Sequence, residues 1–241
     1  MRPAYYAASR GSDWWTLLHP PYTGWHLSYA VVGAMLAPHV FVSRLLGTVL
    51  AFFLAVGLAA HALDELHGRP LRTRIPARAL WAVVWGGLLG ALGLGVFGVV
   101  LVGWTLVPFM VLGPLLVVGY NAELFGGAIH TDVGFAASWG AFPVLVGYVG
   151  QGGPLGSVRV LGTLLAAGGA LFLSLAQRSL STPARDLRRR VSAVSGEVIF
   201  ASGRIEPVSA ETLLRPLERA LRAGSWAIML TAAALALARL T

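Results

Sequence analysis

The sequence contains no cysteine and no lysine, and it is poor in acidic residues. The absence of cysteine excludes disulfide bonds, thiolate metal ligands and cysteine nucleophiles. Only 12% of the residues are charged, which is about half of the roughly 25% found in soluble domains. Together with 56% hydrophobic residues and a mean hydropathy of +0.73, this composition predicts an integral membrane protein.

All 18 basic residues are arginines, and they outnumber the 10 acidic residues to give a net charge of +8. We expect no nucleic-acid partner, because the arginines cluster at the ends of apolar runs, where they act as topology signals. The lack of lysine is consistent with the codon bias of a GC-rich genome. We expect the protein to lie in a prokaryotic inner or plasma membrane.

Seven apolar runs are candidates for membrane helices, since a spanning helix needs about 20 mostly apolar residues. The expected ranges are 22–36, 40–64, 79–101, 104–121, 133–149, 155–177 and 225–240. They predict an all-α, polytopic transmembrane bundle over residues 22–178, and a last transmembrane helix within residues 224–241.

Residues 1–21 are expected to lie at the membrane interface. Residues 1–13 lack an apolar core of the length needed for a cleavable signal peptide. The aromatic residues of this segment favour the headgroup region; they are Tyr5, Tyr6, Trp14 and Trp15.

Residues 179–223 carry much of the remaining charge and predict a small cytoplasmic unit. Residues 191–200 alternate loosely between apolar and polar, and Gly203 offers a turn, so we expect a hairpin. Ser209 is a candidate N-cap for an amphipathic helix that is interrupted or kinked near Pro216. The basic region 185–222 is a candidate docking surface for a protein partner.

Arginine placement also predicts the orientation. Four arginines follow the second predicted span and five follow the sixth, whereas the loops after the first, third and fifth hold few. The positive-inside rule then places the N-terminus and the even-numbered loops in the cytoplasm, and the C-terminus outside. Two polar stretches, 60–74 and 120–132, would share one membrane face and could form one site.

These two stretches hold all four acidic residues between Trp14 and Arg185. Ionisable groups near a bilayer are costly and by default indicate function. In the first stretch, Asp64 and Glu65 follow His61 by three and four positions. A helix therefore places both carboxylates on the same side as His61. That spacing is used by metal-binding helical bundles; a hydrogen-bonded helix end is the alternative.

The second stretch offers further polar side chains, and its Gly126-Gly127 pair allows a turn that brings His130 back toward Glu123. Asp132 is either a ligand or the N-cap of the next helix. His26, in the first predicted span, is either a ligand or a hydrogen-bonded core histidine. The candidate metal ligands are His61, Asp64, Glu65, Glu123, His130, Asp132 and His26.

The basic loop after the second span has guanidinium groups that suit a phosphate or diphosphate. Topology and attraction to anionic lipid are the alternative explanation. The candidate substrate-binding or diphosphate-binding residues are Arg69, Arg72, Arg74, Asn121 and His67.

This layout resembles the UbiA prenyltransferase superfamily over roughly residues 20–177. The polar stretch 60–67, the basic segment 69–76 and the second stretch 120–132 occupy the positions of that family's motifs. The pattern Gly140-x-x-Pro143-x-x-x-Gly147 is also similar. The resemblance implies a bundle whose acidic motifs hold Mg²⁺ and a prenyl diphosphate.

The sequence departs from that family in two ways. His61, His67, Glu123 and His130 stand where the family has aspartate or asparagine, and seven spans are expected where the family usually has nine. Imidazole with carboxylate favours Fe, Mn or Zn over Mg²⁺.

Three hypotheses therefore remain open from the sequence. The first is a metal-dependent membrane enzyme acting on a lipophilic substrate, such as an isoprenoid, a quinone or a long-chain lipid. The second is a Mg²⁺-dependent prenyl-diphosphate transferase. The third is a non-catalytic subunit of a larger membrane complex.

Overall fold

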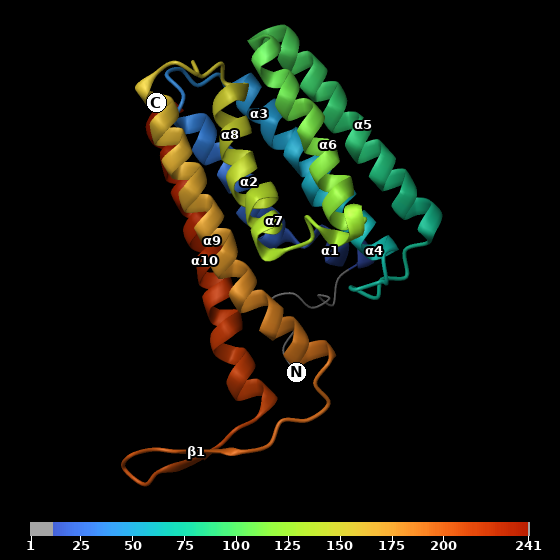
Figure 1. The fold of residues 1–241 in the computed structure, drawn as a ribbon, viewed down its shortest axis with the longest axis vertical. Helices are drawn as coiled ribbons and strands as arrows, with labels where there is room; N and C mark the ends of the chain where they lie inside the picture. Colours follow the sequence, from blue (N-terminus) through green and yellow to red (C-terminus); the bar gives the residue numbers. More distant parts are fainter. Residues whose placement is uncertain (1–11, 241) are drawn as a thin grey trace.

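The computed structural model describes residues 12–240, and the regular secondary structure in this range is helical except for one short hairpin (Figure 1). The α-helices are α1 (Asp13–Leu18), α2 (Pro20–Met35), α3 (Val42–Phe52), α4 (His61–Leu66), α5 (Ala77–Val102), α6 (Val107–Asn121), α7 (Asp132–Ala136), α8 (Phe142–Gly150), α9 (Val158–Arg189) and α10 (Ala210–Leu240). The predicted all-α bundle is confirmed at this level. Tyr5 and Tyr6 of the expected interfacial segment lie outside the described residues.

Four short helical turns of other kinds connect these helices. They are the π-helices η1 (Phe53–Ala60) and η4 (Ala137–Ala141), and the 3₁₀ turns η2 (Trp104–Leu106) and η3 (Phe125–Gly127). Because η1 joins α3 to α4 and η4 joins α7 to α8, each trio forms one continuous rod. π-Helical turns are rare and are frequent at functional sites; η1 ends directly before His61.

Six helical segments in the described residues are long and apolar enough to cross a membrane. They are Val42–Leu66, Ala77–Val102, Trp104–Asn121, Asp132–Gly150, Val158–Arg189 and Ala210–Arg239. The expected first span is the 16-residue helix α2, which begins two residues earlier than predicted because proline is well suited to the first turn of a helix. Six apolar helices of this kind indicate an integral membrane protein.

Helix α2 lies inside the bundle, where it packs mainly against α8 and α10. Its contact with α8 is made by glycines: a Cβ on Gly33 would overlap the backbone oxygen of Val144, and one on Gly147 would overlap that of Ala30. Small residues allow this close approach of helices in membranes. Gly147 belongs to the glycine–proline pattern noted in the sequence.

We expect Gly147→Ala to destabilise the protein by about 1–3 kcal/mol, the usual cost of forcing a methyl group into a packed core. Thermal unfolding in detergent measures the change. Gly168→Ala on α9 is the matched control, since a Cβ there meets nothing within 4 Å. An equal effect of both substitutions would contradict this view of the α2–α8 contact.

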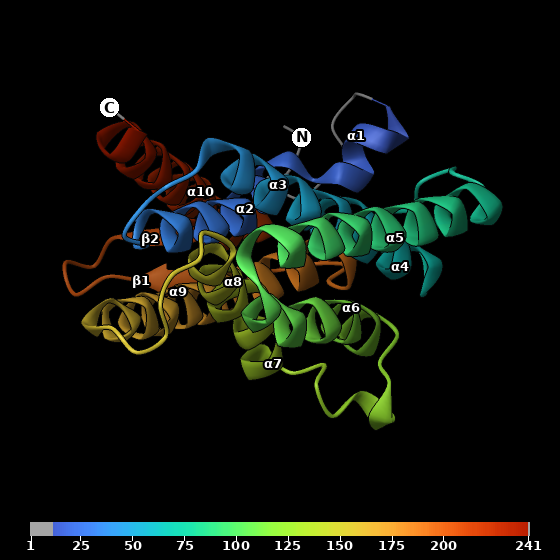
Figure 2. The same cartoon turned by 90° about the horizontal axis from the view of Figure 1, so that it is seen from above.

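Helices α9 and α10 run side by side along one edge of the bundle and extend beyond it, ending in the hairpin (Figures 1 and 2). At 1.5 Å per residue, their 32 and 31 residues give lengths of about 48 and 46 Å, whereas the hydrocarbon core is about 30 Å thick. We call the projecting part, residues 179–223, the arm.

The arm both confirms and corrects the sequence analysis. The hairpin is present: β1 (Glu197–Ile199) pairs antiparallel with β2 (Ile205–Pro207), and Ser209 caps the following helix. The prediction of a separate amphipathic helix is wrong, because α10 runs without a break through Pro216 to Leu240. Helix α9 likewise continues 12 residues beyond its predicted end at Gln177.

Candidate functional site

A polar cavity of about 540 Å³ lies between the start of α2, α4, the end of α6 and the second half of α9. Both polar stretches contribute to its walls, so they meet as predicted. His61, Asp64 and His67 come from the first stretch, and Asn121, Glu123 and His130 from the second. Tyr22, Tyr120 and Phe135 provide aromatic surfaces in the same cavity.

Asp64 and Glu65 are neighbours on α4 and have different surroundings. Asp64 is half-buried and lines the cavity. Glu65 is fully buried, and its carboxylate accepts hydrogen bonds from the backbone N–H of Leu71 (2.9 Å) and from the N–H and hydroxyl of Thr73 (2.7 and 2.8 Å). Both oxygens of Glu65 therefore hold the following loop in place and are not available to a ligand.

Three of the four histidines that line the cavity share one arrangement. Nδ1 lies within hydrogen-bond distance of a backbone carbonyl oxygen in His61 (Gly57, 3.0 Å), His67 (Leu63, 3.0 Å) and His130 (Tyr120, 2.9 Å). A carbonyl can only accept, so Nδ1 carries the proton in the neutral ring and Nε2 keeps its lone pair. Each ring is thus prepared to accept a proton or to bind a cation through Nε2.

His26 stands behind this wall. It is buried, its Nδ1 donates to the carbonyl of Trp139 at 2.7 Å, and its ring packs against Tyr22 and Phe135, whose side chains line the cavity. Its Nε2 has no hydrogen-bond partner among residues 12–240. His26 is therefore the hydrogen-bonded core histidine that the sequence allowed, one layer behind the cavity.

The second stretch turns at Gly126 and Gly127, which both adopt positive φ angles (66° and 77°). The turn folds His130 onto Tyr120, where the two rings stack at 4.5 Å between centroids. Asn121 is buried and donates from Nδ2 to the carbonyl of Val117 at 2.7 Å. This turn places the residues of the stretch on the cavity wall.

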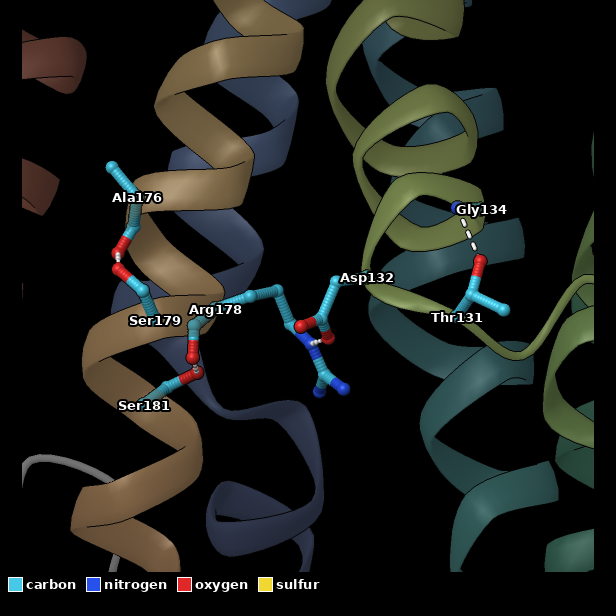
Figure 3. Close-up of polar contacts among 7 residues, drawn as sticks. All are labelled: Thr131, Asp132, Gly134, Ala176, Arg178, Ser179 and Ser181. Carbon is cyan, nitrogen blue, oxygen red and sulfur yellow. Dashed lines mark hydrogen bonds and ion pairs between the residues drawn. The ribbon is translucent and has the colours of Figure 1, made fainter.

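Asp132 pairs with α9 and does not line the cavity. Its carboxylate accepts from Nε of Arg178 at 2.9 Å (Figure 3). The N-cap of α7 is Thr131, whose hydroxyl accepts from the N–H of Gly134 at 2.9 Å, so the alternative in which Asp132 caps this helix is wrong. Asp132 instead helps to orient Arg178, which also lies over the ring of Phe135.

Of the three arginines expected to bind a diphosphate, only Arg72 lines the cavity. The guanidinium of Arg69 donates to the carbonyls of Thr73 (3.3 Å) and Ile75 (2.6 Å), which uses it within the loop. The backbone N–H of Arg74 donates to the Asp13 carboxylate at 2.7 Å, which ties the loop to α1.

Sequence reasoning missed the four arginines that α9 contributes to the cavity, which are Arg178, Arg185, Arg188 and Arg189. Arg178 was placed at the end of the bundle and the other three in a separate cytoplasmic unit, because the sixth span was expected to end at Gln177. Their signal was present in the spacing: positions 178, 185 and 189 differ by seven and four, so a continuous helix presents them on one side. Arg188 pairs with Glu218 of α10, which also lines the cavity.

The backbone around the cavity is strained. The non-glycine residues with positive φ in the described part of the chain are His19, Arg69, Arg72 and Glu123 (48°, 52°, 55° and 48°). Three of them, His19, Arg72 and Glu123, line the cavity. Such conformations cost roughly 1–3 kcal/mol each and cluster at active and ligand-binding sites.

The predicted metal ligands do not form a recognisable metal-binding group in the described part of the chain. Within residues 12–240, no group of three or more His, Asp or Glu side chains is arranged to hold a metal ion. Metal binding by His61, Asp64, Glu123 and His130 thus stays a prediction. Searches against protein-family models, curated proteins and solved structures find no significant match to this chain.

Proposed function

We propose that the protein is a membrane enzyme that binds the phosphorylated head of an isoprenoid or similar long-chain lipid, with transfer chemistry of the UbiA type. The observation that carries the proposal is the arginine cluster of the cavity, formed by Arg72 and the four arginines of α9. The proposed cytoplasmic orientation of this end would give the cavity access to soluble co-substrates.

Charge supports an anionic ligand. The carboxylates of the cavity are Asp64, Glu123 and Glu218, against five guanidinium groups. Arg178 is paired with Asp132 and Arg188 with Glu218. The remaining arginines, Arg72, Arg185 and Arg189, form no ion pair with a carboxylate within residues 12–240. Guanidinium groups donate in the forked geometry that phosphate oxygens accept.

Asp64 and Glu123 are the residues that would hold a divalent cation beside such a ligand. Both line the cavity, and each comes from a different polar stretch. Two carboxylates plus phosphate oxygens suit Mg²⁺, and the ion would neutralise charge on the leaving diphosphate. The nearby histidines, whose Nδ1 atoms are held by backbone carbonyls, are placed to accept a proton from an acceptor substrate through Nε2.

Binding of farnesyl diphosphate, compared with farnesol, tests the proposal. We expect the purified protein to bind the diphosphate and not the alcohol, and to bind it more tightly in Mg²⁺. Asp64→Asn should remove the Mg²⁺ enhancement, and Asp186→Asn, on the arm outside the cavity, should leave it unchanged. Equal binding of diphosphate and alcohol would contradict the proposal.

A second candidate is metal-dependent chemistry on a lipophilic substrate, favoured by the three cavity histidines whose Nδ1 protons are held by backbone carbonyls. Metal-binding histidines almost always make such a bond through the other ring nitrogen. Metal analysis of the wild type beside His61→Ala and Glu123→Ala tests it. The expected result is bound Fe, Mn or Zn that both substitutions lower; unchanged metal in both variants would overturn the assignment.

The third hypothesis, a non-catalytic subunit with a protein partner on the arm, remains a proposal for residues 185–222. Three arginines of that region face the cavity. A partner would therefore meet the rest of the arm, including the exposed strands Glu197–Ile199 and Ile205–Pro207.

A further inference from the structure

A second, apolar groove of about 270 Å³ runs between α3, α5, α6 and α8. It begins near the polar cavity, at Val56, Val117 and Trp139, and it ends at Arg44. Because Arg44 and His61 lie near opposite ends of the span Val42–Leu66, the groove leads from the cavity end of the bundle to the other membrane interface.

The groove is distinct from the polar cavity. The two share no lining residue, and an aromatic layer lies between them. Tyr120 and Phe135 face the cavity, Trp139 faces the groove, and the rings of Tyr120 and Trp139 meet edge to face at 5.9 Å between centroids.

The polar groups of the groove are concentrated at its far end. Ser43, Arg44 and Thr48 of α3 line that end, whereas its inner end is built from Phe52, Val56 and further apolar side chains. An apolar chain entering from the polar cavity would place its terminal methyl group against the guanidinium of Arg44, which would be unfavourable. A chain with an anionic head at Arg44 would satisfy both ends.

Arg44 is positioned to receive such a head. Its guanidinium donates to the carbonyls of Gln151 (3.1 Å) and Leu101 (3.0 Å) and lies 4.3 Å from the ring centroid of Phe41. These contacts use two of five N–H donors. The buried side-chain amide nitrogen of Gln151 has no hydrogen-bond partner within residues 12–240.

The charge at this end is of one sign. Residues 14–63, 66–122, 133–185 and 219–241 contain no acidic residue, so no aspartate or glutamate side chain lies in the helices and loops that surround Arg44. Arg239 reaches the same region, where it donates to the carbonyls of Ala37 (2.6 Å) and Pro38 (3.0 Å). Cationic side chains at a membrane interface attract anionic lipids.

We propose that the groove holds one acyl chain of an anionic bilayer phospholipid, with the lipid phosphate on Arg44. The ligand comes from the bilayer because side chains along the groove, including Phe97 and Leu101, are exposed on the outer surface of the bundle. This inference does not depend on the function proposed for the polar cavity.

Native mass spectrometry of the full-length protein tests the proposal, after incubation in detergent with equal amounts of dioleoyl phosphatidylglycerol and dioleoyl phosphatidylcholine. We expect the wild type to retain one phosphatidylglycerol in preference. Gly47→Leu should abolish retention, since Gly47 lines the groove and a Cβ there meets nothing within 4 Å. Gly93→Leu is the matched control, because Gly93 has equal free space and lies outside the groove lining.

Arg44→Ala should reduce the preference for phosphatidylglycerol over phosphatidylcholine by about fivefold, the effect of one cationic side chain near an anionic membrane surface. Retention of both lipids equally by the wild type, or of neither, would overturn the proposal. So would a Gly47→Leu variant that retains phosphatidylglycerol as the wild type does. Arg44 also donates hydrogen bonds to the ends of two helices. If Arg44→Ala fails to fold for this reason, the comparison of Gly47→Leu with Gly93→Leu still tests the proposal.

Discussion

Replacing Arg185 by alanine is expected to weaken the binding of farnesyl diphosphate by about ten- to a hundredfold. Arg185 lines the polar cavity and forms no ion pair with a carboxylate within residues 12–240. A hydrogen bond to a charged group contributes about 1.5–3 kcal/mol, which corresponds to that range of affinity. Titration of the detergent-purified protein with the diphosphate measures the change.

Arg190→Ala is the matched control for this prediction. Arg190 lies five positions further along the arm, its side chain is 76% exposed, and it pairs with Asp186 away from the cavity. It should leave the affinity within about twofold, because exposed ion pairs contribute little. Equal losses in the two variants would indicate nonspecific attraction by the basic arm and would remove the arginine cluster as the basis of the proposed function.

Replacing Glu65 by alanine is expected to lower the free energy of unfolding by at least about 3 kcal/mol. The substitution leaves the N–H of Leu71, and the N–H and hydroxyl of Thr73, without their acceptor, and Thr73 is buried. Each buried donor left without a partner costs about 1–3 kcal/mol. Thermal or denaturant unfolding in detergent measures the loss, and easier proteolysis at residues 68–74 should accompany it.

The neighbouring carboxylate provides the comparison. Asp64 lines the cavity, and within residues 12–240 its carboxylate accepts no hydrogen bonds like those of Glu65, so Asp64→Ala should change stability by less than about 1 kcal/mol. It should nevertheless reduce the effect of Mg²⁺ on diphosphate binding. If Asp64→Ala destabilises the protein as strongly as Glu65→Ala, the division of roles between the two carboxylates is wrong.

Much of the fold could be predicted from apolar runs and breakers alone. The helices between residues 42 and 150 were expected within a few residues, and the hairpin near Gly203 was expected from its turn. The meeting of the two polar stretches followed from the even number of spans between them and from Gly126-Gly127. These features depend on local sequence and on membrane thickness, which a single sequence reveals.

The roles of individual side chains could not be predicted in the same way. Helical spacing placed both Asp64 and Glu65 on the side of His61, so the sequence did not distinguish their roles. Only the path of the loop after α4 brings backbone N–H groups to Glu65. Arg69 and Arg72 were likewise equivalent in the sequence. Their separation depends on which carbonyls the loop presents, which is a tertiary property.

The arginines of α9 were missed for a different reason. The hydropathy of the segment falls after Gln177, and a spanning helix of normal length was expected to end there. The helix continues because α10 packs alongside it and the Arg188–Glu218 pair joins the two. The end of α9 is thus stabilised by a segment 30 positions later in the chain. Hydropathy evaluated for each apolar run separately does not detect such a contact.

The place of α2 between α8 and α10 has a consequence for biogenesis. This helix is synthesised before both neighbours, which follow it by more than 100 and nearly 200 residues. Until then, its interior face, with Trp25 and Tyr29, has no lasting partner; in the finished bundle Gly224 of α10 packs against Trp25. Translation must therefore reach α10 before α2 can reach its final packing, and a nascent chain interrupted ahead of α10 would leave Trp25 without its contact to Gly224.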